Sequence, residues 1–193
     1  MKYSLIALFL LINLSSESIL SDTAYFAGGC FWCMEADFEK LNGVTEVISG
    51  FSGGTLENPT YQGNHEGHYE TVQIIYDPEI VSYSELLEYF WRHIDPFDDQ
   101  GQFCDKGFSY LSAVFVSSQA ERNLAELSKS KIQSRFPKQE VVTPILEFTH
   151  FYPIKGKESY HQDYYKNNPL RYKYYRWSCG RDKRLQQIWG EAS

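Results

Sequence analysis

Cysteine, proline and repeated sequence are scarce in this chain of 193 residues. It contains four cysteines and seven prolines, and no tandem repeat or low-complexity segment. Four cysteines are too few to hold a domain of this size together by disulfide bonds, although they suit redox chemistry. The lack of a repeat excludes solenoids and propellers.

An excess of basic side chains and a long apolar run are also missing. The 18 Lys and Arg residues against 25 Asp and Glu residues give a net charge of −7, which disfavours binding to nucleic acids and to anionic lipid surfaces. The apolar run at residues 6–12 is too short to span a bilayer. We therefore expect no nucleic-acid partner and no membrane anchor in the mature chain.

Apolar and aromatic residues are abundant. Hydrophobic residues make up 42% of the chain and charged residues 22%, which excludes a disordered chain. The 15 Tyr, 13 Phe and 4 Trp residues favour aromatic-lined pockets or surfaces. Residues 22–193 are enough for one domain with a substantial core.

The N-terminus is typical of an export signal. Met1 and Lys2 precede the apolar run 6–12, and serines at 15, 16, 18 and 21 offer several cleavage sites. The sequence predicts a signal peptide over 1–21 and a periplasmic or secreted protein, with the cleavage position left open. The alternatives are an ordinary apolar N-terminus or a retained anchor.

The order of predicted elements favours an α+β fold. Alternation and helical spacing predict strands at 23–27, 44–51, 69–76, 110–116 and 141–148, and helices at 31–41, 82–94, 118–132, 158–166 and 183–189. Ser82 and Glu85 form a capping-box pattern. The β-α-β-β-α-β-α-β succession predicts a mixed sheet with helices packed on one side, a two-layer sandwich with a ferredoxin-like core.

Cys30 lies where the first strand gives way to the first helix. Unpaired N–H groups at a helix N-terminus stabilise a thiolate, so the position predicts a lowered pKa and fast alkylation. Gly28 and Gly29 precede it and leave room for a tight turn and a substrate. The alternative is a buried, inert cysteine.

Cys30 and Cys33 have the two-residue spacing of a dithiol redox site. Thr143-Pro144 before an apolar strand could supply the cis-proline loop of a thioredoxin-like oxidoreductase, which is the rival enzyme hypothesis. A metal-stapled binding module is the non-enzyme alternative, because cysteines one turn apart can also bind a metal.

Several blocks resemble one family in register. They are Gly28-Gly29-Cys30-Phe31-Trp32-Cys33-Met34-Glu35, Gly50-Phe51-Ser52-Gly53-Gly54, Asn58-Pro59-Thr60-Tyr61, Gly67-His68-Tyr69-Glu70, Gln102-Phe103-Cys104-Asp105 and Glu158-Ser159-Tyr160-His161-Gln162. The first block resembles the GCFW(G/C)xE signature of the A-type peptide-methionine sulfoxide reductases. The resemblance covers about residues 23–170 and implies reduction of the S-epimer of methionine sulfoxide, free or in proteins, with thiols and with no metal or organic cofactor.

The resemblance also implies roles for site residues. Cys30 is the expected nucleophile and Glu70 the expected acid, which requires an apolar site that keeps its carboxyl group protonated. Phe31 and Trp32 resemble the aromatic cage for the substrate methyl group, with ordinary core packing as the alternative. His161 is expected to pack or to form hydrogen bonds.

Three polar residues match positions that bind the sulfoxide oxygen, contact the acid or orient the substrate in the family. They are Tyr61, Asp105 and Tyr110, and the alternative for each is an ordinary loop or strand polar group. Only eight residues separate Tyr61 from Glu70, fewer than in many relatives, which leaves Tyr61 the least secure of the three.

Three cysteines could resolve the sulfenic acid formed on Cys30. Cys33 lies one turn along the helix, on the face of Asp37, so bonding would strain that turn. Cys104 is adjacent to a site residue. Cys179 lies in a glycine-bearing C-terminal segment, where family members often place this cysteine, so Cys179 is the predicted partner and Cys33 and Cys104 stay open.

The resemblance implies a thioredoxin-like thiol reductant as partner, and we expect a monomer. His65 and His68 are three residues apart in a loop, the wrong spacing for a helical zinc motif. Seven basic residues between 164 and 184 indicate a solvated or partner-docking face rather than a nucleic-acid site.

Overall fold

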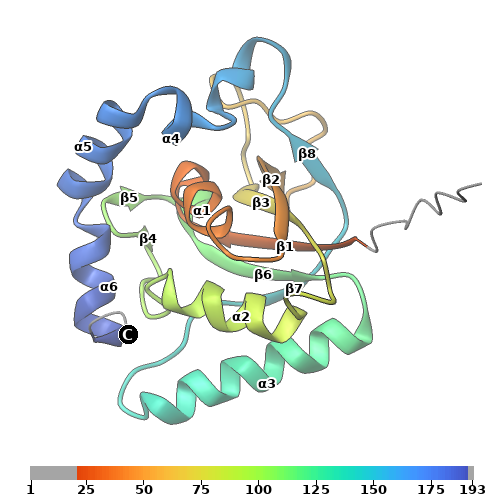
Figure 1. Ribbon diagram of the computed structural model, residues 1–193, viewed down its shortest axis with the longest axis vertical. Coiled ribbons are helices and arrows are strands. Elements are labelled where there is room, and N and C mark those ends of the chain that lie inside the picture. Colours follow the sequence, from red (N-terminus) through yellow and green to blue (C-terminus); the bar gives the residue numbers. More distant parts are fainter. Residues whose placement is uncertain (1–20, 191–193) are drawn as a thin grey trace, which may run out of the picture.

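The computed structural model describes residues 21–190, and in these residues a six-stranded mixed sheet is packed against helices (Figure 1). The strands are β1 (Asp22–Gly28), β2 (Val44–Ser52), β3 (Tyr69–Tyr76), β4 (Gly101–Gln102), β5 (Asp105–Lys106), β6 (Ser112–Val116), β7 (Ile145–Glu147) and β8 (Phe151–Pro153). The α-helices are α1 (Phe31–Phe38), α2 (Tyr83–Arg92), α3 (Gln119–Arg135), α4 (Tyr164–Asn167), α5 (Pro169–Cys179) and α6 (Arg181–Trp189). Two 3-10 helices occupy Phe108–Tyr110 and Gly156–His161.

The sheet order is β7-β6-β1-β3-β2-β8, and β4 and β5 form a separate hairpin. In the six-stranded sheet, β6-β1-β3-β2 is antiparallel throughout, and β6 and β7 pair in parallel. Together with α1 and α2 this is the β-α-β-β-α-β order of a ferredoxin-like core. The predicted α+β class and core are confirmed.

Helices α1 and α2 cover one face of the sheet, and α3 packs beside α2. The core between them is built from fully buried aromatic and aliphatic side chains, among them Phe26, Phe38, Leu86 and Phe90. The opposite face carries a smaller cluster of Ala27, Tyr69, Ala113 and Phe115. The apolar side chains of α2 are buried, and Ser82 and Glu85 form the predicted capping box.

The C-terminal third departs most from the predicted elements. The predicted strand 141–148 is a strand only at Ile145–Glu147, because the N–H of Val142 binds the carbonyl of Pro96 in a loop. The predicted helix 158–166 is divided between a 3-10 turn and α4. Helix α5 and strand β8 were not predicted.

Among residues 21–190, no helix is long and apolar enough to cross a membrane. The predicted signal peptide over 1–21 lies, apart from its last residue, outside the described residues.

Candidate active site

Cys30 is the N-cap of α1, at the point where β1 ends. Its carbonyl accepts from the N–H groups of Cys33 (3.0 Å) and Met34 (3.3 Å), which starts the helix. Gly29 has φ +82°, and a Cβ there would lie 2.5 Å from Cβ of Gln102. Only glycine fits this turn, so the predicted need for glycine before the cysteine is met at Gly29 by both conformation and space.

Glu70 places a buried carboxyl group at this helix start. It lies near the start of β3, opposite Phe51 of β2, and its side chain is 2% exposed. Oε2 accepts from the N–H of Phe31 at 3.0 Å. Burial raises the pKa of Glu70 to about 8. The carboxyl group is therefore mostly protonated at neutral pH, the state that a proton donor needs.

The ionisation of the two free thiols differs from the sequence-based expectation. Burial raises the pKa of Cys30 well above its usual value, and Cys33 and Glu70 raise it further. The expected lowering by the helix N-terminus was wrong for this resting structure, because Cys30 is only 6% exposed and desolvation outweighs the helix dipole. The pKa of Cys33 is instead lowered to about 7, by the hydrogen bond with Cys30 and by the charges of Arg181 and Arg176.

Tyr61, Tyr110 and Asp105 lie around Cys30 and Glu70. Burial raises the pKa of Tyr61 to about 12, and the charges of Glu70 and Cys30 raise it as well. Burial also raises the pKa of Tyr110, with contributions from Glu70, Tyr61, Cys30 and Asp105. The structure therefore brings together all five residues that were predicted to be catalytic.

Phe31 and Trp32, the expected aromatic cage, also pack against other aromatic side chains of the domain. Phe31 is 1% exposed and meets Phe51 edge to face at 6.1 Å between ring centroids. Trp32 stacks on Tyr164 at 3.8 Å, and its Nε1 donates to Nδ1 of His161 at 3.0 Å. His161 therefore carries its proton on Nε2, and its ring lies 3.9 Å from that of Tyr61. The expected packing and hydrogen-bonding role of His161 is confirmed.

The charges beside Cys33 come from helices α5 and α6, and the sequence reasoning missed them. Arg176 Nη1 donates to Asp37 Oδ2 at 2.9 Å. Arg181 is 1% exposed, donates to the carbonyls of Gly28 and His93, and lies 3.9 Å from Asp37. Cys33 itself is 2% exposed and packs under Tyr172. Cys33 lies near Asp37 as expected, but this face of α1 is buried because α5 covers it.

The other two cysteines form a disulfide. Cys104 and Cys179 are joined across 75 residues, with Cα atoms 4.9 Å apart, while Cys30 and Cys33 are free. Beside this bond, Tyr175 Oη donates to Asp105 Oδ2 at 2.5 Å. The bridge therefore fixes the end of α5 against the β4-β5 hairpin that carries Asp105.

Two groups in the described residues have the composition of a metal site. One is Cys104, Asp105 and Cys179, whose sulfurs are already bonded to each other. The other is Glu35, Glu39 and Asp163, where Lys166 Nζ lies 2.6 Å from Glu39 and 2.7 Å from Asp163. In this second group an ammonium ion already supplies the positive charge.

The two loop histidines have structural partners. His65 Nδ1 lies 3.0 Å from the carbonyl of Thr60, and His68 Nε2 lies 2.8 Å from that of Leu56. His68 is also fully buried. Backbone contacts therefore account for both rings.

The rival thioredoxin-like hypothesis required a cis peptide bond at Thr143-Pro144. All peptide bonds in residues 21–190 are trans. Thr143 instead pairs its hydroxyl with that of Ser112 at 2.9 Å inside the fold. The segment thus supports the sheet edge rather than a dithiol site.

Comparison with known proteins agrees with this site. The family model for peptide methionine sulfoxide reductase matches residues 22–193. A peptide methionine sulfoxide reductase MsrA of Bacillus licheniformis is 49% identical over 173 residues, which cover 88% of this chain and 94% of the relative. An MsrA/MsrB of Vibrio cholerae is 45% identical over 182 residues, 92% of this chain, but the match spans only 47% of that longer relative.

The fold also has a solved counterpart. Methionine sulfoxide reductase A of Corynebacterium diphtheriae superimposes with a TM-score of 0.68 and 30% identity, over 78% of this chain and 76% of that one. The sequence resemblance is thus confirmed over nearly the whole domain, by a family model, by relatives of similar length and by structure. The chain belongs to the peptide methionine sulfoxide reductase family.

Proposed function

We propose that the protein reduces the S-epimer of methionine sulfoxide, free or in oxidised proteins, to methionine, and so repairs oxidised proteins. The observation that carries the proposal is the pairing of Cys30 with Glu70. A thiol at the start of α1 shares a buried site with a carboxyl group whose pKa is raised to about 8. A nucleophile for sulfur and a proton for oxygen are the two groups that sulfoxide reduction needs.

In the first step, the Cys30 sulfur attacks the sulfoxide sulfur while Glu70 donates its proton to the oxygen. The protonated oxygen then passes to the Cys30 sulfur, the transient sulfur–sulfur bond and the substrate's sulfur–oxygen bond both break, and Cys30 is left as a sulfenic acid. Methionine leaves with the electron pair, and Glu70 regains the proton that Cys30 lost. Tyr61, Tyr110 and Asp105 orient the substrate oxygen, and Trp32 and Phe31 contact its methyl group.

In the second step, a thiol attacks the sulfenic sulfur, a disulfide forms and water leaves. Cys179 remains the proposed attacking residue, with Cys33 and Cys104 as alternatives. The Cys104–Cys179 bond beside free Cys30 is consistent with a subsequent exchange, in which Cys104 displaces Cys30 from Cys179. Such an exchange returns the Cys30 thiol and leaves the oxidised pair near the surface.

A thioredoxin-like dithiol then returns the oxidised pair to thiols. The N-terminal residues 1–21 favour export, so this donor would act outside the cytoplasm, and we propose that the mature domain 22–193 is a periplasmic or secreted monomer. A tagged chain that stayed in the cytoplasmic fraction at full length would contradict the export proposal.

Turnover with separated epimers tests the function. Purified residues 22–193 should release methionine from the S-epimer with dithiothreitol as reductant and should leave the R-epimer unchanged. Cys30→Ser should abolish release, and Ser130→Ala, a change at an exposed position of α3, should not. Reduction of insulin disulfides without sulfoxide turnover, or turnover by Cys30→Ser, would contradict the proposal.

A further inference from the structure

The outer face of α5 carries a row of exposed apolar side chains. Leu170, Tyr174 and Trp177 are 83%, 69% and 77% exposed. They lie at positions i, i+4 and i+7, which form one stripe along a helix. Large exposed apolar residues that gather in this way mark interaction surfaces in soluble proteins.

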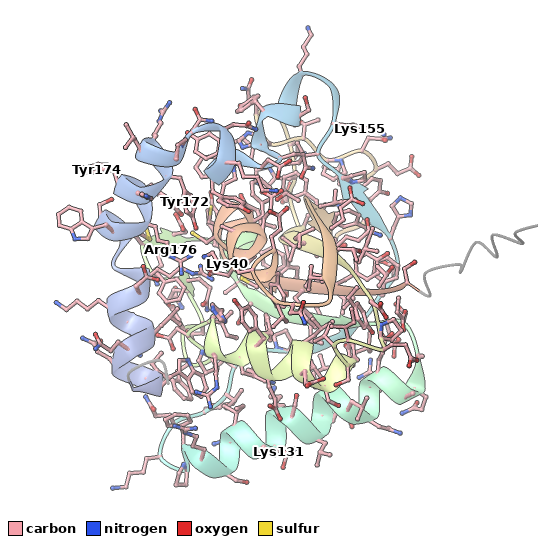
Figure 2. The ribbon with its side chains drawn as sticks, in the orientation of Figure 1. Lys40, Lys131, Lys155, Tyr172, Tyr174 and Arg176 are labelled. Carbon is pink, nitrogen blue, oxygen red and sulfur yellow. A yellow bond between two sulfur atoms is a disulfide. The ribbon has the colours of Figure 1, made fainter. Side chains whose placement is uncertain are left out.

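The opposite face of α5 is fixed to the domain, so the stripe is not a displaced core face. Tyr172 is buried against Cys33, and Arg176 pairs with Asp37. In Figure 2, Tyr174 lies on the outer side of the helix, while Tyr172 and Arg176 lie on the side of α1. The stripe is therefore a rigid surface that points away from the site.

This helix ends at the exposed disulfide. Cys179 is the last residue of α5, and its partner Cys104 is exposed. Cys30 and Cys33, by contrast, are 6% and 2% exposed. A protein that brings a dithiol to this enzyme therefore reaches Cys104–Cys179 more readily than either buried thiol.

The charge around the stripe is opposite to that of the chain. Arg171, Lys173 and Lys183 are exposed and form no ion pair within residues 21–190, although the chain has a net charge of −7. Beside Trp177, Lys173 and Lys183 line a pocket of about 260 Å³. The face thus fits a partner with apolar side chains ringed by acidic ones.

We propose that the Leu170-Tyr174-Trp177 face of α5 docks a thioredoxin-like protein dithiol, which then attacks the Cys104–Cys179 bond at Cys104. The proposal rests on the function above and names the surface that the reductant uses. It predicts that docking matters for a protein donor and not for a small thiol.

The surroundings of the two sulfurs decide which sulfur is attacked and which leaves as a thiolate. The N–H of Cys104 lies 3.2 Å from Sγ of Cys179 and stabilises negative charge there. Oδ1 of Asp105 lies 3.7 Å from Sγ of Cys104 and disfavours charge on that sulfur. Cys179 is therefore the better leaving thiolate.

The exchange balances over two steps. The donor's first thiolate attacks Cys104, a mixed disulfide forms, and Cys179 leaves as a thiolate. The donor's second thiol then attacks the donor's first sulfur in the mixed disulfide, so that the donor is oxidised and Cys104 is released as a thiol. Two electrons and two protons pass from the donor to the pair, and the freed Cys179 is again available to a sulfenic acid.

The test compares two reductants in one assay. Methionine release from free S-sulfoxide is measured with a purified bacterial thioredoxin, its reductase and NADPH, and separately with dithiothreitol. Trp177→Ala and Leu170→Ser together should lower kcat/KM for thioredoxin about tenfold, as loss of interface anchors does, and should leave the dithiothreitol rate unchanged. Leu127→Ala, a 55% exposed leucine on α3, is the matched control and should change neither rate.

Two further measurements address charge and polarity. Lys173→Glu with Lys183→Glu should lower the thioredoxin rate and weaken its dependence on salt. A thioredoxin whose second cysteine is serine should be trapped on the oxidised enzyme, and peptide mapping should find it bonded to Cys104.

The opposing outcomes separate the hypotheses. A full thioredoxin rate in the α5 variants, or trapping on Cys30, Cys33 or Cys179, would overturn the proposal. A loss seen equally with dithiothreitol would show that the stripe only supports the fold, and would also overturn the reductant site. No turnover with dithiothreitol in the wild type would instead overturn the function itself.

Discussion

Replacing Glu70 with glutamine removes the proposed proton donor and keeps its local structure. Glutamine retains an oxygen that can accept from the N–H of Phe31, now 3.0 Å away, so the start of α1 stays paired. Alanine would leave that buried N–H without a partner and would mix a folding defect with a chemical one. Glu70→Gln is therefore the informative variant.

The expected loss follows from the raised pKa. With a pKa of about 8, roughly nine-tenths of Glu70 is protonated at pH 7, against almost none at the usual value. Loss of a positioned general acid lowers a rate by about 10²–10⁴. The single-turnover rate of methionine release should fall by that factor, while substrate affinity changes little.

The pH profile provides a second, independent readout. The charge of Glu70 contributes to the raised pKa of Cys30, and the proposed reaction requires one proton on these two groups together. The wild-type rate should therefore decline at high pH, beginning no lower than about pH 8, when the pair loses its last proton. Glu70→Gln has no carboxyl proton to lose and should lack that decline.

Rapid-quench mixing of reduced enzyme with the S-epimer, without added reductant, measures the step directly. The disulfide is first reduced and the reductant removed, so that every active site can turn over. A rate within threefold of wild type, or an alkaline decline that persists in Glu70→Gln, would refute the role of Glu70 as acid.

The remaining predictions concern recycling, backbone geometry and stability. Cys179→Ser should release one equivalent of methionine and then stall with thioredoxin. Peptide mapping of the wild type during turnover should find a Cys30–Cys179 disulfide. A Cys30–Cys33 bond, with full recycling by Cys179→Ser, would show that Cys33 resolves the sulfenic acid. Gly29→Ala should lower the free energy of unfolding by about 1–3 kcal/mol in chemical denaturation and should reduce turnover. The reason is that the new Cβ would lie 2.5 Å from Gln102 at a backbone φ of +82°. Unchanged stability would contradict this steric argument. Burial raises the pKa of Glu35 from 4.5 to about 8, so the folded state binds this proton more tightly and loses stability as pH rises from about 4.5 to 8. Glu35→Gln should therefore raise Tm by about 3 °C more at pH 9 than at pH 5 in calorimetry. An equal change in Tm at both pH values would refute the titration of Glu35.

Local sequence rules found the elements that build the ferredoxin-like core. The alternation at 69–76 is β3 residue for residue, and the capping box at Ser82 and Glu85 starts α2. Both signals depend on neighbouring residues only, so they can be recognised before the chain folds. The same rules placed Cys30 at the helix start, which required only the Gly28-Gly29 break.

Elements held by distant partners escaped those rules. Helix α5 begins at Pro169, a residue favoured in the first turn of helices, but its mixture of tyrosine and basic residues was interpreted only as a solvated or partner-docking face. Strand β8 has three residues and exists only because β2 offers an edge for pairing. Neither could be identified from spacing alone.

The sequence by itself determined the family, the core order and the positions of the proposed catalytic thiol and acid, since motifs and periodicity are properties of short segments. Tertiary structure decided the ionisation of those groups. Burial raises the pKa of Cys30 and Glu70, while Arg176 and Arg181, more than 140 residues away in the chain, lower that of Cys33. The Cys104–Cys179 pairing is likewise decided by the packing of α5, because desolvation, charge and thiol proximity depend on which segments meet in space.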